Sequence, residues 1–92
     1  MKFLSTFAIR PGSVPDAARR FIAGKAAPPP GITLLGRWHK ADLSGGFTLY
    51  ETNDAAAVYA YAAEWAPYLE MHTAPVVEDA DAGPILARLY GQ

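Results

Sequence analysis

The chain contains no cysteine in its 92 residues, and this absence removes several kinds of chemistry at once. It excludes disulfide bridges, zinc sites built from thiolates and a cysteine nucleophile. Because a chain without disulfides suits a reducing compartment, we expect a cytoplasmic location. No apolar run approaches the roughly 20 residues that a membrane-spanning helix requires.

The apolar N-terminal stretch is not typical of a signal peptide, because Ser5, Thr6 and Arg10 interrupt it and Pro11-Gly12 ends it. We interpret it as a first strand. The formal net charge is −1, so there is no general attraction to nucleic acid or to an anionic membrane. The basic residues lie mainly in the first forty positions but are not interleaved with aromatic residues. We therefore expect neither nucleic acid nor a membrane as a partner.

Two motifs that often identify a function are also missing. Gly45-Gly46 lacks the lysine and the following helix of a phosphate-binding loop. No serine lies in the Gly-x-Ser-x-Gly pattern that positions a hydrolase nucleophile. Nothing in the sequence points to a nucleotide or a hydrolytic triad, and we expect no cofactor.

Hydrophobic residues are abundant, at 51% of the chain. A chain of this length forms one domain, residues 1–92, and buries only about 60–65% of its unfolded surface. The hydrophobic surplus exceeds what so small a core needs, and an exposed apolar face is commonly covered by another subunit. We therefore expect a homodimer.

The order of predicted elements is β-α-β-β-α-β followed by a short helix. Strands are expected at 2–10, 31–41, 46–52 and 68–77. Helices are expected at 14–22, where apolar residues recur at helical spacing, and at 55–66. A last short helix is expected to start at the acidic residues 78–81 and to have its apolar side within 85–90. This order predicts a ferredoxin-like α+β fold with a four-stranded antiparallel sheet and two helices on one face. A twin sheet from a second subunit would cover the other face and close a dimeric α+β barrel.

Several segments of the sequence resemble those of a known family. They are Met1-Lys2-Phe3, Pro29-Pro30-Gly31-Ile32-Thr33-Leu34-Leu35-Gly36-Arg37-Trp38-His39, Gly46-Phe47-Thr48-Leu49-Tyr50-Glu51-Thr52-Asn53-Asp54, Trp65 and Thr73-Ala74-Pro75-Val76. Together they resemble a bacterial domain-of-unknown-function family that is similar to the dimeric α+β-barrel superfamily. The resemblance implies a fold and dimerisation but no activity, because that superfamily includes cofactor-free monooxygenases, haem-handling enzymes, isomerase-like proteins and simple binders.

Aromatic residues suggest a pocket between the helices and the sheet. Tyrosine and tryptophan combine apolar area with one polar tip, which suits an aromatic or hydrophobic ligand. Arg37 either pairs with Glu51 on the neighbouring strand or holds a ligand carboxylate. Ordinary core packing of the aromatic residues is the alternative. The predicted ligand-binding residues are Arg37, Trp38, Tyr50, Trp65 and Tyr68.

The only histidines, His39 and His72, are the candidate catalytic bases. The alternative, which the sequence favours for both, is a surface or half-buried histidine with one hydrogen-bond partner. Together with Glu70 and Glu51 they are the only candidates for a metal site, which we do not expect. The register of the hairpin is open, because a slip of one residue decides whether Trp38 or His39 faces the helices.

Two functions remain from this reasoning. The first is a binding protein that holds a small apolar or aromatic molecule between helices and sheet. The second is a cofactor-independent enzyme, similar to a monooxygenase or an isomerase, that uses a histidine base on such a molecule. A purely structural role also stays open. The sequence favours binding slightly, because catalysis needs a base placed beside a tyrosine or arginine.

Overall fold

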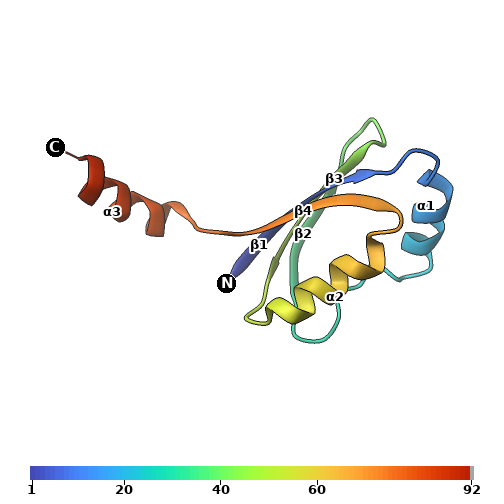
Figure 1. Cartoon of the computed structure of the whole chain (residues 1–92), viewed down its shortest axis with the longest axis horizontal. Coiled ribbons are helices and arrows are strands. Elements are labelled where there is room, and N and C mark those ends of the chain that lie inside the picture. The colour runs from blue at the N-terminus through green and yellow to red at the C-terminus, as the bar shows by residue number, and fades with distance from the viewer. Residues whose placement is uncertain (92) are drawn as a thin grey trace.

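The protein folds as a four-stranded antiparallel sheet with two helices on one face and a third helix apart from it (Figure 1). The computed structural model describes residues 1–91. The strands are β1 (Lys2–Ile9), β2 (Thr33–His39), β3 (Gly45–Glu51) and β4 (Leu69–Val76), in the spatial order β2-β3-β1-β4. The helices are α1 (Val14–Ile22), α2 (Ala55–Trp65) and α3 (Asp79–Tyr90). The predicted ferredoxin-like α+β fold is confirmed.

Local signals in the sequence set the two helices that cover the sheet. Asp54 precedes α2, and its carboxylate accepts hydrogen bonds from the backbone N–H groups of Ala56 and Ala57 at 3.0 and 3.2 Å. Helix α1 has Pro15 in its first turn, where a missing N–H costs nothing. Ser13 stands at the N-cap of α1, but its side chain makes no capping hydrogen bond.

The core lies between the helices and the inner face of the sheet. β1 and β3 contribute Phe3 and Tyr50, whose rings stack with centroids 6.0 Å apart. α2 contributes the apolar stripe that its helical spacing predicts. The buried members of this cluster are Phe3, Ala26, Ile32, Tyr50, Val58, Tyr61, Trp65 and Leu69.

A β-bulge in β2 sets the register of the hairpin. Leu34 pairs with Tyr50, but the next paired residue of β2 is Gly36, which lies opposite Leu49, so Leu35 is extra. Beyond the bulge, Arg37 pairs with Thr48 and His39 with Gly46. A Cβ on Gly36 would lie 2.3 Å from the Trp38 ring, so this glycine marks both the bulge and a close approach by another group.

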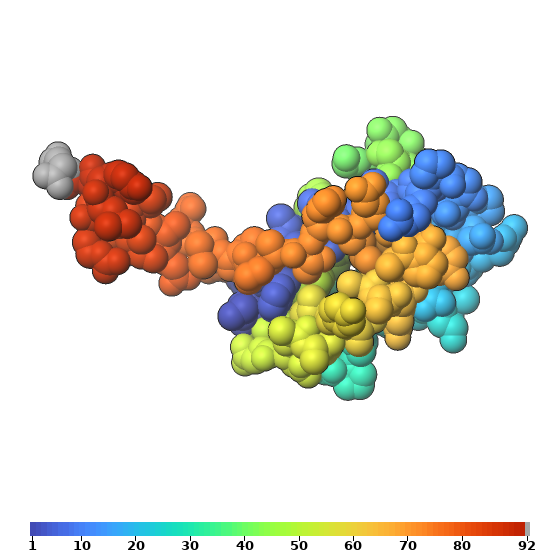
Figure 2. Space-filling model, in the orientation of Figure 1, coloured from blue at the N-terminus to red at the C-terminus, as the bar shows by residue number. Residues whose placement is uncertain are grey.

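Helix α3 projects away from the rest of the molecule (Figures 1 and 2). No residue of α3 is buried, and Ile85, Leu86 and Leu89 are exposed. The radius of gyration is 15.7 Å, against roughly 12 Å for a compact chain of this length. The accessible surface is 6376 Å², about 1,200 Å² more than the roughly 5,200 Å² typical of a monomer of this mass. The chain therefore leaves more surface uncovered than a compact monomer does.

Residues 77–78 connect β4 to α3, and an exposed ion pair links this connection to β1. The Lys2 ammonium contacts the Glu78 carboxylate, which lowers the Glu78 pKa below its usual value and raises that of Lys2. Within the described residues, no helix has both the length and the apolar character needed to cross a bilayer.

Candidate functional site

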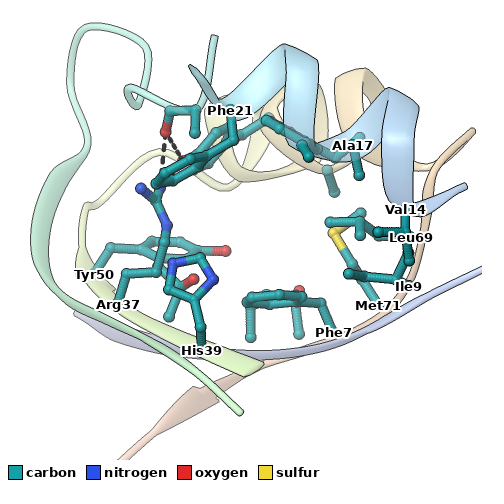
Figure 3. A pocket seen from close by; sticks show the side chains of 18 of the residues that line it. Phe7, Ile9, Val14, Ala17, Phe21, Arg37, His39, Tyr50, Leu69 and Met71 are labelled. Carbon is teal, nitrogen blue, oxygen red and sulfur yellow. Dashed lines mark hydrogen bonds between the residues drawn. The ribbon is translucent and has the colours of Figure 1, made fainter. Parts of the chain in front are cut away.

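A cavity of about 400 Å³ lies between the inner sheet face and helices α1 and α2. This volume falls in the range of small-molecule sites. Figure 3 shows Arg37, His39 and Tyr50 at one end, Phe7 on the floor, and Ile9, Val14, Leu69 and Met71 at the other end. Small residues of α1, including Ala17 and Ala18, leave room where larger side chains would fill the space. The cavity thus has one end with polar groups and one that is apolar.

A row of polar side chains crosses the sheet beneath this cavity. The register places Arg37 of β2 opposite Thr48, Thr48 opposite Ser5, and Ser5 opposite Thr73. Partners in register share a face, so all four side chains lie on the cavity side, and all four line it. The Thr73 hydroxyl donates to the Ser5 hydroxyl at 2.9 Å. The row therefore supplies hydroxyl groups and one guanidinium to an otherwise apolar floor.

Arg37 is fixed by two neutral oxygen atoms. Its Nη2 donates at 2.8 Å to the backbone oxygen of Ala26 and at 2.8 Å to the Tyr61 hydroxyl. The same hydroxyl donates to the Ala26 oxygen at 2.5 Å. Burial raises the pKa of Tyr61, and the Arg37 charge opposes that rise. These three groups, from α2, β2 and the segment after α1, form a closed hydrogen-bonded cluster at the polar end.

Aromatic rings enclose the polar end of the cavity. The His39 ring lies edge-on to Phe21, with centroids 5.3 Å apart, and edge-on to Phe7 at 6.2 Å. The Arg37 guanidinium lies 5.7 Å from the centre of the Phe21 ring. Phe21 is partly exposed, and it stands over Arg37 in Figure 3. Within residues 1–91, His39 makes no hydrogen bond to an arginine or a tyrosine.

The sequence matches the family described as Domain of unknown function (DUF3303) over residues 1–90. The chain belongs to the DUF3303 family. No curated protein matches it. The description of DUF3303 assigns no activity.

Four of the predicted site residues of this DUF3303 member come together at the cavity. Arg37, His39, Tyr50 and Trp65 all line it, from β2, β3 and α2. Burial raises the pKa of Tyr50, and the hydroxyl of Thr73 opposes that rise. Both tyrosines of the cavity therefore stay neutral at physiological pH and can donate hydrogen bonds.

The expected place of Trp38 in the cavity wall is corrected by the bulge. Trp38 follows Arg37, so its side chain points to the opposite face of the sheet. There it is 49% exposed and stacks on Phe47 with ring centroids 5.0 Å apart. The register that the sequence leaves open is thus decided in favour of His39 facing the helices.

Tyr68 and His72 also lie outside the cavity. Tyr68 packs edge-on against Trp65 at 6.2 Å, and the Arg20 guanidinium lies over both rings at 5.3 and 5.8 Å. The His72 side chain is 79% exposed and lies 3.6 Å from Glu70. Its partner in register, Thr6, lies on the face away from the helices, so the sheet separates the two histidines.

The same pairings place the charged residues that the sequence offered for an ion pair or a metal site. Glu51 pairs with Thr33 and Lys2, three positions away from Thr48 and on the opposite face, so the suggested Arg37–Glu51 ion pair does not form. His39 and the pair His72 and Glu70 lie on opposite faces, which rules out their convergence on one ion. Across residues 1–91, no cluster of three or more metal-ligating side chains occurs.

Several cavity residues were not singled out from the sequence. Ser5, Thr48 and Thr73 are short hydroxyl residues within otherwise apolar strands, and each alternates in phase with a core residue of its own strand. That phase could have placed them on the inner face. Phe21 and Met71 carry no such signal, because an apolar residue at a core position is equally typical of plain packing.

Proposed function

We propose that this protein binds a small apolar or aromatic molecule in the cavity between α1, α2 and the sheet. The observation that carries the proposal is an open volume of about 400 Å³ in a chain of only 92 residues, lined mainly by apolar side chains with a few convergent polar groups. A core of this size packed for stability alone would fill such a space, because voids forfeit dispersion contacts and hydrophobic transfer energy.

The test is a thermal-shift screen with neutral probes, 4-phenylbutanol and 1-octanol, followed by calorimetric titration. A ligand that binds only the folded state raises the melting temperature, by an amount that grows with its concentration. Ala62 of α2 lines the cavity, so Ala62→Leu should fill it and abolish the shift. Ala60 lies on the same helix but is exposed and outside the lining, so Ala60→Leu should leave the shift unchanged. No shift with either probe in the wild type would refute the proposal.

The positions of the two histidines support catalysis less well than the cavity supports binding. A histidine base in a cavity needs a neighbour that orients it or stabilises the anion it creates. His39 packs against aromatic rings and has no hydrogen bond to an arginine or a tyrosine in residues 1–91, and His72 faces away from the cavity. This arrangement favours binding over proton abstraction.

We also propose that two copies of the chain associate through the outer sheet face. That face carries the Trp38–Phe47 stack, whose rings are exposed in the single chain, and the bulge residue Leu35 is exposed as well. The surface excess of about 1,200 Å² exceeds the roughly 800 Å² that each partner buries in a standard interface. The exposed apolar residues of α3 also require cover.

Sedimentation velocity at micromolar concentration tests this assembly. The wild type should sediment as a dimer, and Phe47→Glu should dissociate it because the interface would bury an unpaired charge. Tyr59→Glu introduces the same charge at an exposed position of α2 and should leave the dimer intact. A lone wild-type subunit would overturn the proposal.

A further inference from the structure

The charge inventory of the cavity is unbalanced. Arg37 is the only permanently charged side chain that lines it, and no aspartate or glutamate is among the lining residues of the described chain. Glu64 lies 3.9 Å from Arg20 instead, and Glu51 is out of register with Arg37. A partly buried guanidinium without a carboxylate attracts an anion more strongly than an exposed one, because less water screens it.

The orientation of Arg37 is set in advance, while part of its hydrogen-bonding capacity is unused. Both protein acceptors, the Ala26 oxygen and the Tyr61 hydroxyl, are bound by Nη2 alone. The Nε and Nη1 groups donate to no protein acceptor within residues 1–91. A guanidinium has five N–H donors in one plane, so a pair of donors remains for a planar acceptor group. Because the side chain is already fixed, a ligand loses little affinity to ordering it.

The cross-strand neighbour of Arg37 brings a hydroxyl group to the same cavity. Thr48 lies opposite Arg37 in the register and is only 7% exposed, and its hydroxyl makes no side-chain hydrogen bond in the described residues. Thr48 lines the cavity, and its hydroxyl is not used by another side chain of the described residues. The Thr48 hydroxyl can therefore donate to the same ligand group as Arg37.

The remainder of the cavity limits the charge and shape of the ligand. Away from Arg37 the described lining has no permanently charged group. Ser5 and Thr73 add hydroxyls. Phe7, Ile9 and Met71 are apolar, and Figure 3 shows them at a distance from the guanidinium. One cation balances one negative charge, so a dianion such as a phosphate monoester would keep a charge without a partner. A carboxylate has the planar, two-oxygen shape that matches the guanidinium.

We infer that the ligand is a hydrophobic monocarboxylic acid, whose carboxylate accepts hydrogen bonds from Arg37 and Thr48 while its aromatic or aliphatic tail occupies the apolar end. This inference rests on the proposed binding function and specifies the chemical class of the ligand. It also gives the Arg37–Tyr61–Ala26 cluster a role, because that cluster holds the guanidinium where the carboxylate binds.

The experiment compares matched acids and alcohols by calorimetric titration of the wild-type protein at pH 7. 4-Phenylbutyrate should bind at least about tenfold more tightly than 4-phenylbutanol, and octanoate at least about tenfold more tightly than 1-octanol, which is the effect of roughly one charge-assisted hydrogen bond. Equal affinities, or tighter binding of 4-phenylbutylamine, would overturn the inference while leaving the binding function in place. Binding of neither acids nor alcohols would overturn both.

Variants then locate the preference at Arg37. Arg37→Gln should remove the preference for the acids while keeping the affinity for the alcohols. Arg19→Gln removes the same charge from an exposed position of α1 outside the cavity and should keep the preference. Thr48→Val preserves shape and tests the hydroxyl without removing the charge, so it decides the matter if Arg37→Gln does not fold. A preference for acids that is unchanged in both Arg37→Gln and Thr48→Val would contradict the assignment.

Discussion

Removing the hydroxyl of Tyr61 should destabilise the protein, because that one oxygen joins α2 to β2 and to the segment after α1. It donates to the Ala26 oxygen at 2.5 Å and accepts from Arg37 at 2.8 Å. Tyr61 is buried, and its ring also packs edge-on to Tyr50 with centroids 6.1 Å apart. Tyr61→Phe keeps the ring and deletes only the hydrogen bonds.

The magnitude follows from what is left behind. The Ala26 oxygen still accepts from Arg37 at 2.8 Å, so no buried carbonyl is orphaned. The loss is therefore one neutral hydrogen bond and one to a charged group that water partly replaces, which together are worth about 1–2.5 kcal/mol. For a domain of this size, that corresponds to a fall in melting temperature of roughly 5–15 °C.

Urea unfolding followed by circular dichroism measures this loss as a lower midpoint with an unchanged slope. Tyr59→Phe is the matched control, because Tyr59 lies on the same helix and is 79% exposed. It should change the free energy of unfolding by less than about 0.5 kcal/mol. Equal stability of Tyr61→Phe and Tyr59→Phe would refute the view that the cluster at the polar end holds α2 to β2.

Three further changes should alter the stability of the fold through particular contacts. Asp54→Ala removes the N-cap of α2 and should cost about 0.5–2 kcal/mol in urea unfolding, whereas Asp16→Ala breaks only an exposed ion pair and should cost less. Gly46→Ala should lower the free energy of unfolding in urea by about 1–3 kcal/mol, because its Cβ would lie 2.0 Å from a backbone oxygen of β2 that cannot rotate away. Burial raises the pKa values of Tyr50 and Tyr61 in the folded state. Their contribution to stability is therefore complete below about pH 10, the pKa of an unfolded tyrosine, and is lost as the pH rises through the raised pKa values of the folded state. Urea midpoints should consequently fall above about pH 10. The fall should be less steep in Tyr61→Phe, which has one of the two groups fewer.

Most of the fold could be predicted from the chain because local signals and periodicity agree. The stripe of α1, the Asp54 cap and the Pro67 stop each indicate a helix without help from distant residues. The β-α-β-β-α-β order then leaves few topologies. The position of α3 could not be predicted in this way, because an apolar helix face indicates that the helix is covered but not which surface or which copy of the chain covers it.

The sequence predicts which residues lie near the site but not the register of the β2–β3 hairpin, which decides which of them face the cavity. Arg37, Trp38 and His39 are consecutive, so two of them face one way and the third faces the other. An uninterrupted ladder from the Leu34–Tyr50 pair would set Trp38 opposite Gly46, on the cavity side, and Arg37 opposite Phe47, on the outer face. The extra residue at Leu35 reverses this assignment. Gly36 indicates an irregularity in the strand. It does not indicate whether the residues after it keep the inward–outward alternation of the residues before it.

That single inserted residue connects the two surfaces on which the proposals depend. It directs the guanidinium of Arg37 into the cavity and, in the same step, directs the Trp38 ring outward onto Phe47. The Trp38 ring then lies over Gly36. Only glycine leaves room for the ring at this position, because a Cβ would lie 2.3 Å from it. A change that removed the bulge would therefore withdraw the charge from the cavity and the aromatic stack from the outer face together. Ligand preference and assembly should consequently respond to the conformation of β2 as one unit, although the residues that carry them lie on opposite sides of the sheet.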